Sequence, residues 1–145
     1  MSGIIVGVDG SGHSDRALDW AAREAALRHA PLTVLTVHQI AVGYTGNPIH
    51  LPADQAPTEH ARALAQERTD KVLASLSTPP PQVTVRSVAG IPSQELLNAA
   101  HDADMLVVGS RGAGGFTQLL LGSVSAQVTH HAPCPVVVIP PKNRN

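Results

Sequence analysis

The segment Asp104-Met105-Leu106-Val107-Val108-Gly109-Ser110-Arg111-Gly112 decides the fold of this chain. Its apolar part, Met105 to Val108, predicts a strand from Asp104 to Gly109 that is buried on both faces of a sheet. Small residues end this strand, and a second small group, Gly122-Ser123-Val124-Ser125, follows Gly112 after nine intervening residues. The second group predicts the start of a short helix from Ser123 to His131. A buried strand, a glycine-rich turn and a helix in this order are typical of an α/β protein.

The same alternation extends along the rest of the 145 residues. Further strands are expected at Ile4 to Val8, Leu32 to His38, Gln82 to Val88 and Pro135 to Ile139. Further helices are expected from a Ser14 cap to Arg28, from a Thr58 cap to about Ser75, and after Gly90-Ile91-Pro92. We expect residues 39–56 to form a long surface loop and 140–145 a fraying tail. The side chains expected to face the core are Ala17, Leu18, Ala21, Ala22 and Ala25, then Leu64, Val72, Leu73 and Leu76, and finally Leu96, Leu97 and Ala100.

This pattern predicts a single α/β domain over residues 1–145, with an open five-stranded parallel sheet and helices on both faces. Strand orders 3-2-1-4-5 and 2-1-3-4-5 are both common for such a sheet, and 3-2-1-4-5 is the order expected here. In this arrangement the strand order reverses between strands 1 and 4, although all strands stay parallel. A crevice would then lie beyond Val8-Asp9 and Val108-Gly109, which is where open α/β sheets bind ligands.

The composition excludes several classes of protein. Hydrophobic residues make up 43% and charged residues 14%, which is typical of a globular chain. A net charge of -1 and one residue each of Trp, Tyr and Phe argue against nucleic-acid binding. The single cysteine, Cys134, excludes an internal disulfide and fits a reducing compartment. No apolar run approaches the roughly 20 residues that span a membrane, so a cytoplasmic protein without membrane contact is expected.

The turn after Val108 carries the first candidate site. Gly109 and Gly112 allow backbone amides to approach a ligand closely, and Ser123 and Ser125 add hydroxyls at a helix start. Amides and hydroxyls arranged in this way suit phosphate oxygens, so the pattern predicts a nucleotide site. An ordinary loop and plain capping serines are the structural alternatives.

Two charged residues belong to the same predicted crevice. Asp9 ends the first strand, where a carboxylate can accept hydrogen bonds from ribose hydroxyls or take a metal ion beside phosphates. Its alternative role is a turn residue that binds its own loop amides. Arg111 is either a phosphate contact or a solvated charge. The chain has neither a P-loop Gly-x4-Gly-Lys-[Ser/Thr] nor a dinucleotide G-x-G-x-x-G after the first strand.

Other reactive side chains fit structural roles. The eight histidines have no spacing typical of metal ligands, so a histidine metal site is not expected. Cys134 lies between two prolines before an apolar run and is expected to be a small core residue. Trp20 is expected to pack its helix against the sheet.

These residues resemble the universal stress protein family over nearly the whole chain. The resemblance begins at Val8-Asp9-Gly10-Ser11 and the alanine-rich helix, and continues through Val88-Ala89-Gly90-Ile91-Pro92. It closes with the G-x2-G-x9-G-[ST] spacing from Gly109 to Ser123 and with Pro133-Cys134-Pro135-Val136. That spacing is similar to the ATP-binding branch of the family and implies a Rossmann-like fold of the adenine nucleotide alpha-hydrolase type.

The resemblance also implies a role for each residue of the site. Asp9 would face the ribose, and Val37 would lie against the adenine, although Thr36 stands where relatives often have histidine. Gly10 and Ser11 would join from the first turn. The residues that would line the phosphates, mostly through backbone amides, are Gly109, Arg111, Gly112, Gly122, Ser123, Val124 and Ser125.

The implied function is an ATP-binding regulatory module in the stress response, often accompanied by Mg²⁺ or Mn²⁺. Family members usually form homodimers, often through their last strands, which here implies Val136 to Ile139. A slow ATP hydrolase is an alternative, although the chain lacks a P-loop lysine and an evident base. A sensor or buffer of another adenine nucleotide, such as cyclic AMP, is a third reading. Residues 39–56, with Tyr44, could close over the adenine or form a variable surface loop.

Overall fold

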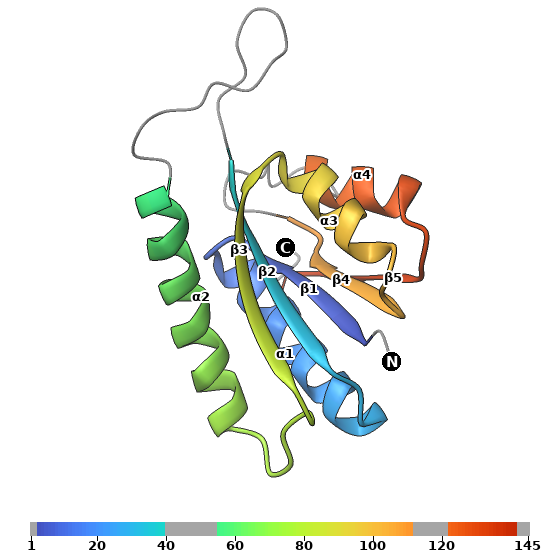
Figure 1. Cartoon of the computed structure of the whole chain (residues 1–145). Helices are drawn as coiled ribbons and strands as arrows, with labels where there is room; N and C mark the ends of the chain where they lie inside the picture. The colour runs from blue at the N-terminus through green and yellow to red at the C-terminus, as the bar shows by residue number, and fades with distance from the viewer. Residues whose placement is uncertain (1–2, 40–54, 112–121, 142–145) are drawn as a thin grey trace, which may run out of the picture.

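Five parallel strands form one open sheet in the order β3-β2-β1-β4-β5 (Figure 1). The computed structural model describes residues 3–39, 55–111 and 122–141. This order confirms the expected arrangement and excludes 2-1-3-4-5. The strands are β1 (Ile4–Val8), β2 (Leu32–Gln39), β3 (Val83–Gly90), β4 (Met105–Gly109) and β5 (Val136–Ile139).

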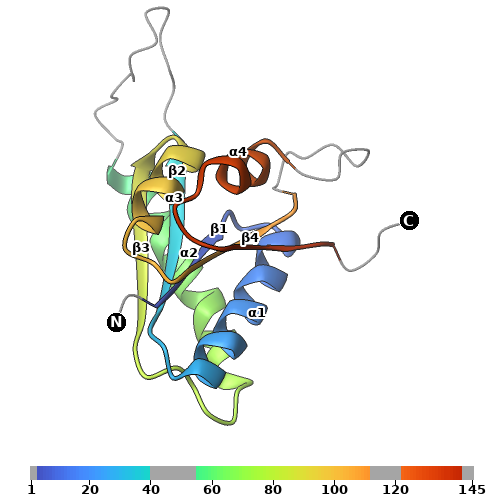
Figure 2. The same ribbon diagram turned by 90° about the vertical axis from the view of Figure 1, so that its right-hand side faces the viewer.

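Helices cover both faces of the sheet (Figures 1 and 2). Helices α1 (Gly12–Arg28) and α2 (Gln55–Ala74) lie on one face, and α3 (Pro92–Ala100) and α4 (Ser123–His131) lie on the other. Strand residues alternate between two hydrophobic cores, so that Val107 packs with α1 whereas Val108 packs with α3 and α4. Both side chains are buried, which is why the strand has an uninterrupted apolar sequence.

Helix α1 packs against the sheet through small side chains, as its sequence predicts. Ala17, Ala21, Ala22 and Ala25 are fully buried, and Leu18 is 1% exposed. Alanines on this face let the helix approach the sheet closely. Trp20 packs at the edge of the same core, which confirms its expected structural role.

The predicted cap of α1 is wrong by three residues. The N-cap is Ser11, whose hydroxyl oxygen accepts a hydrogen bond from the Ser14 amide at 3.3 Å. Ser14 lies in the first turn, is buried, and donates its own hydroxyl to the Ser11 carbonyl at 3.0 Å. The helix therefore begins at Gly12, immediately after the turn that ends β1.

The inner face of α2 also differs from the prediction. The helix begins at Gln55, so Thr58 lies within it and does not cap it. Ala65, Thr69, Val72 and Leu76 form the inward stripe, with Thr69 fully buried. Leu64, predicted to face inward, is 46% exposed because it lies one position outside this stripe.

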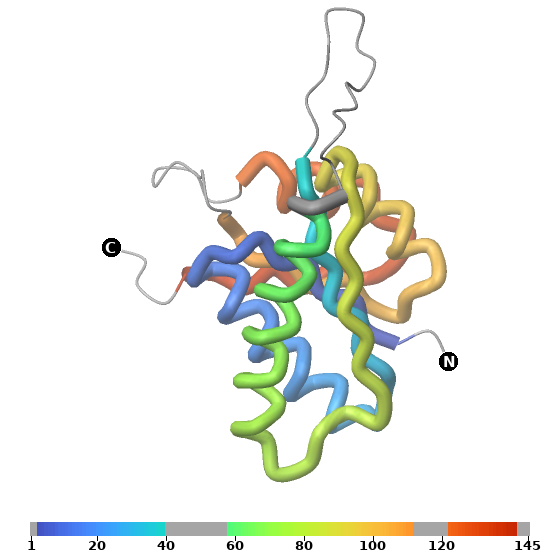
Figure 3. The backbone as a smooth tube through the Cα atoms, turned by 60° about the vertical axis from the view of Figure 1, so that its left-hand side comes forward, coloured from blue at the N-terminus to red at the C-terminus, as the bar shows by residue number. Residues whose placement is uncertain are grey.

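Helices α1 and α2 lie side by side along the sheet (Figure 3). Arg68 of α2 donates to both carboxylate oxygens of Asp15 in α1, at 2.6 and 2.5 Å. This ion pair joins α2 to the first turn of α1.

Strand β3 pairs with β2 without interruption from Val83 to Gly90. Val83 and Val85 face α1 and α2, whereas Val88 faces the other core. Val85 and Val88 are three positions apart, so the alternation of a regular strand places them on opposite faces. After β3, Pro92 opens α3, and Leu96 and Ala100 are buried as predicted, with Leu97 packed beside them.

The expected loop and tail lie largely outside the described residues, because 40–54 and 142–145 fall beyond them. Tyr44 belongs to that part. Within the described ranges, no helix has both the length and the hydropathy required to cross a membrane.

Candidate nucleotide-binding crevice

The turn after β1 is held by its own side chains. The Asp9 Oδ1 atom accepts hydrogen bonds from the Ser11 amide at 2.9 Å and from the Ser11 hydroxyl at 2.6 Å. The Asp9 amide donates to the Ser14 hydroxyl oxygen at 3.2 Å. Asp9 therefore has the turn role that the sequence left as its alternative, and its carboxylate is exposed at the end of the strand.

Gly10 gives this turn its shape. Its φ angle is +85°, a conformation that L side chains rarely adopt, and a Cβ atom added here would have nothing within 4 Å. A side chain at this position would therefore be disfavoured by the backbone and not by crowding.

The two turns that were expected to meet do lie together. A Cβ atom added to Gly109 would be 3.2 Å from the His13 carbonyl oxygen, although 96 positions separate these residues in the chain. The end of β4 thus lies against the first turn of α1. Gly112, which belongs to the same predicted site, lies outside the described residues.

Helix α4 begins beside the end of β4. The Gly122 amide donates to the Ser110 carbonyl at 2.6 Å, and the Ser125 hydroxyl donates to the same oxygen at 2.9 Å. Ser110 in turn donates its amide to Ile139 of β5 at 2.9 Å. One residue after β4 therefore ties the edge strand and the start of α4 together.

Neither Ser123 nor Ser125 caps α4, so the alternative of plain capping serines is wrong. Gly122 is the N-cap, with φ -73° and ψ 172°, and no side chain caps the helix. Ser125 is buried and directs its hydroxyl to backbone carbonyls, whereas Ser123 is exposed. The first helical bond is from the Ala126 amide to Gly122, so the amides of residues 123–125 are not used within the helix.

Two helix N-termini thus begin at the carboxyl edge of the sheet. The first backbone bond of α1 is from Asp15 to Ser11, which leaves the Gly12 and His13 amides outside the helical pattern. Each helix N-terminus carries partial positive charge and exposed N–H donors, and both features favour an anion. Gly12, His13 and Ser110 were not among the predicted site residues, because only their backbone groups would be available here and no side-chain type marks such a position.

The structure also places Val37, Val124 and Arg111 of the predicted site. Val37 lies near the end of β2, is half-buried, and packs on the core that faces α3 and α4. Val124 packs against the same core at the start of α4. Arg111 is half-buried just beyond β4.

Neither a histidine site nor a reactive cysteine emerges from the part of the chain described here. Its histidine, cysteine and carboxylate side chains include no group of three that could hold a metal ion. Burial raises the pKa of the Cys134 thiol above its ordinary value, and the nearby Asp104 carboxylate raises it further. Cys134 packs beside the second core, as expected for a structural thiol.

Comparisons with known proteins agree with this fold. The family model described as the universal stress protein family matches residues 1–140. A universal stress protein of Mycolicibacterium smegmatis is 39% identical over 140 residues, which cover 94% of this chain and 47% of that relative. The chain thus spans about half the length of the curated relatives it matches.

Solved structures with a similar fold are also universal stress proteins. The universal stress protein UspA from Lactobacillus plantarum is 27% identical with a TM-score of 0.76, over 95% of this chain and 97% of that one. A universal stress protein crystallised in complex with cAMP is 29% identical with a TM-score of 0.67, over 94% of both chains. On the family match and the 39% identity, the chain belongs to the universal stress protein family.

Proposed function

We propose that this chain binds an adenine nucleotide, with ATP as the principal ligand, in the crevice between the β1–α1 turn and the start of α4. The observation that carries the proposal is the close approach of Gly109, at the end of β4, to His13 in the first turn of α1. The start of α4 is bonded to Ser110, the next residue, so the N-termini of α1 and α4 both lie near this end of β4. Amides of both helices are then available for phosphate oxygens. The G-x2-G-x9-G-[ST] spacing supports a triphosphate over a shorter anion.

Each part of the nucleotide would meet a different element. Asp9 would accept a ribose hydroxyl, helped by Gly10 and Ser11, and Val37 would lie against the adenine. The phosphates would be lined by Gly109, Arg111, Gly112, Gly122, Ser123, Val124 and Ser125. For Ser125 the amide would serve, because its hydroxyl already donates to Ser110.

A divalent cation would enter with the nucleotide. Mg²⁺ and Mn²⁺ prefer oxygen ligands, and phosphate oxygens would supply most of them. Among the described crevice residues, the exposed Asp9 carboxylate is the side chain suited to add to such a set. The protein alone would therefore hold the metal weakly.

The biological role would be that of a cytoplasmic regulatory module in the stress response. Nucleotide binding would alter the pairing of two copies through β5, whose three valines are half-buried at the sheet edge. Ser110 contacts both β5 and α4, so the nucleotide crevice and this edge share a residue.

Cyclic AMP is a second candidate ligand. The structural relative crystallised with cAMP is 29% identical to this chain over nearly its full length. A cyclic phosphate would need fewer amides than a triphosphate, and the rest of the crevice would serve both ligands.

Isothermal titration with ATP, ADP, AMP and cyclic AMP tests the proposal. ATP should bind most tightly, and added Mg²⁺ should strengthen it; no heat with any of the four at hundreds of micromolar would refute the site. A phosphate-release assay on the same samples, with Asp9→Ala as its control, tests the hydrolase alternative.

Gly122→Glu should abolish binding, because it places a bulky anion where the phosphates would lie. Its backbone angles are open to any residue, so the variant should fold. Ala126→Glu is the matched control, since it adds the same charge one turn later at an exposed position. Equal ATP affinity in both variants would show that the site lies elsewhere.

A further inference from the structure

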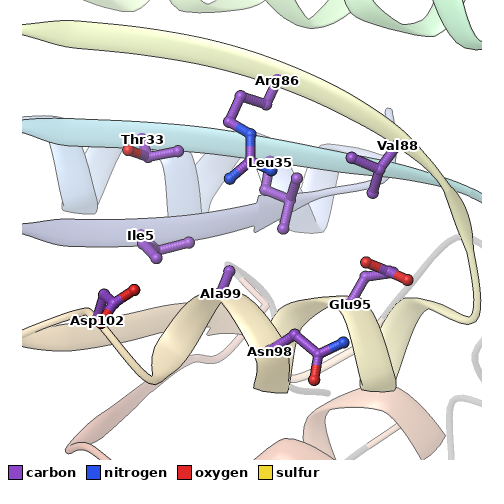
Figure 4. A pocket seen from close by; sticks show the side chains of 9 residues that line it. All are labelled: Ile5, Thr33, Leu35, Arg86, Val88, Glu95, Asn98, Ala99 and Asp102. Carbon is purple, nitrogen blue, oxygen red and sulfur yellow. The ribbon is translucent and has the colours of Figure 1, made fainter.

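A cavity of about 360 Å³ lies between the sheet and α3 (Figure 4). Its floor is apolar and is formed by Ile5, Leu35, Val88 and Ala99 from three strands and the helix. Leu35 is 2% exposed and Ile5 is 7% exposed, so the floor belongs to the core. No residue of the nucleotide crevice lines this cavity.

The walls of the cavity carry opposite charges. Arg86 reaches in from β3, and Glu95 and Asp102 come from α3 and the turn that follows it (Figure 4). Within the described residues, no hydrogen bond or ion pair joins any of these three side chains to another group. A guanidinium and a carboxylate that are exposed to solvent, Arg86 and Asp102, and the half-buried Glu95 carboxylate therefore border one apolar floor without pairing with one another.

The Glu95 side chain lies close to the backbone of Gly90 at the end of β3. A Cβ atom added to Gly90 would lie 2.8 Å from both Cγ and Oε1 of Glu95. The bare glycine at the end of β3 thus makes room for this carboxylate beside Val88 (Figure 4).

These features select the chemistry of a ligand. A lone cation can pair only with Glu95 or Asp102, and a lone anion can pair only with Arg86, so a ligand with one charge leaves the opposite side of the cavity unused. A molecule with both charges can place its carboxylate on the guanidinium and its ammonium on a carboxylate. The cavity volume lies near the lower end of the range of about 300–1,000 Å³ for small-molecule sites, which suits a ligand of few atoms.

We propose that this cavity binds a small zwitterion of the amino-acid class, with one carboxylate and one primary ammonium on an apolar body. The carboxylate pairs with Arg86, the ammonium pairs with Glu95 or Asp102, and the apolar body covers Leu35 and Ile5. The proposal is independent of nucleotide binding, since the two sites share no residue.

Titration of the full chain, followed by amide chemical shifts, tests the idea with matched probes. Leucine and 6-aminohexanoate carry both charges, whereas hexanoate and hexylamine carry one each. The zwitterions should bind at least about tenfold more tightly than either single-charge probe, as expected when one charge-assisted pair is lost. The amide chemical shifts that change on binding should belong to residues of β3 and α3. No shifts with either zwitterion at ten millimolar, or equal affinity for hexanoate, would overturn the proposal.

Two variants complete the test. Arg86→Gln removes the cation, and Ala99→Leu fills the floor from α3, so each should weaken 6-aminohexanoate binding by about tenfold or more while ATP binding stays unchanged. Arg62→Gln is the matched control, because Arg62 is exposed on α2, on the other face of the sheet. Unaltered binding in Arg86→Gln, or equal loss in Arg62→Gln, would reject the site.

Discussion

The Ser125 hydroxyl lies 2.9 Å from the Ser110 carbonyl oxygen and donates a hydrogen bond to it. The Gly122 amide donates to the same oxygen at 2.6 Å. These two contacts attach the beginning of α4 to the residue that follows β4. The position of the α4 amides thus depends on a buried serine that offers no hydroxyl to a ligand.

Replacement of Ser125 by alanine should lower the free energy of unfolding by about 1–2 kcal/mol, because a buried hydrogen bond is lost. It should also weaken ATP binding, since the α4 amides are no longer fixed. Urea denaturation and calorimetric titration measure the two effects. Ser123→Ala is the control: Ser123 is exposed, so its loss should change stability by no more than about 0.5 kcal/mol. Similar effects from both variants would contradict the structural role of Ser125.

Gly109 and Gly10 should respond to substitution for different reasons. Gly109→Val brings a side chain onto the His13 carbonyl, so it should destabilise the chain by about 1–3 kcal/mol and separate the two turns. Gly10→Ala meets open space, so its cost should come from the backbone alone, about 1–2 kcal/mol. Chemical denaturation measures both. ATP binding should fall further in Gly109→Val; a stable Gly109→Val variant would mean that the turns do not touch.

His29 ends α1 in the left-handed conformation, with φ 54° and ψ 39°. Glycine adopts this conformation without a Cβ penalty, so His29→Gly should stabilise the protein by about 1 kcal/mol. Thermal and urea unfolding can check the gain. His101→Gly is the comparison, because His101 has right-handed angles and should gain nothing. A loss of stability in His29→Gly would show that the imidazole makes a needed contact.

Cys134 should react slowly with iodoacetamide near pH 8. Burial and the Asp104 carboxylate both disfavour the thiolate, so its pKa is raised and the reactive fraction at that pH is reduced. Asp104→Asn removes a negative charge and should lower this pKa, which moves the pH–rate profile to lower pH. Alkylation rates measured from pH 7 to 10 give the apparent pKa. A rate equal to that of free cysteine would contradict the burial of the thiol.

The sequence was sufficient for the architecture, because the strands are apolar on both faces and the helices between them have one apolar face. The buried run of β4 and the alanine face of α1 each specify their element and its environment. The expected strand order 3-2-1-4-5 came from what is common for such sheets, since periodicity does not report which strands are neighbours. Pairing of β1 with both β2 and β4 confirmed it.

Helix starts were harder to predict because several residues of the right type lie close together. Ser11 and Ser14 can both cap a helix, and the choice depends on the Asp9–Ser11 contact that shapes the turn. Leu64 was placed inward on hydrophobicity alone, whereas the small Ala65 and the polar Thr69 form the buried stripe. Thr69 satisfies its hydroxyl on the Ala65 carbonyl, so a polar residue is tolerated there.

The candidate site was predicted in part. The meeting of the first and fourth strand ends follows from topology, and the contact of Gly109 with His13 agrees with it. The role of the Ser110 backbone could not be predicted, because main-chain carbonyls are common to all residues. The cavity between the sheet and α3 also had no sequence signal, since Arg86 and Glu95 look like ordinary surface charges.

The start of α4 is built from main-chain groups, with glycine as its cap and no side chain closing the helix end. An alanine scan across this helix would therefore not detect the backbone N–H donors at its start, because truncating a side chain leaves every peptide group in place. Genetic screens for variants that no longer bind the ligand would recover substitutions that displace the backbone, at the glycines and at Ser125. They would miss the exposed positions between them.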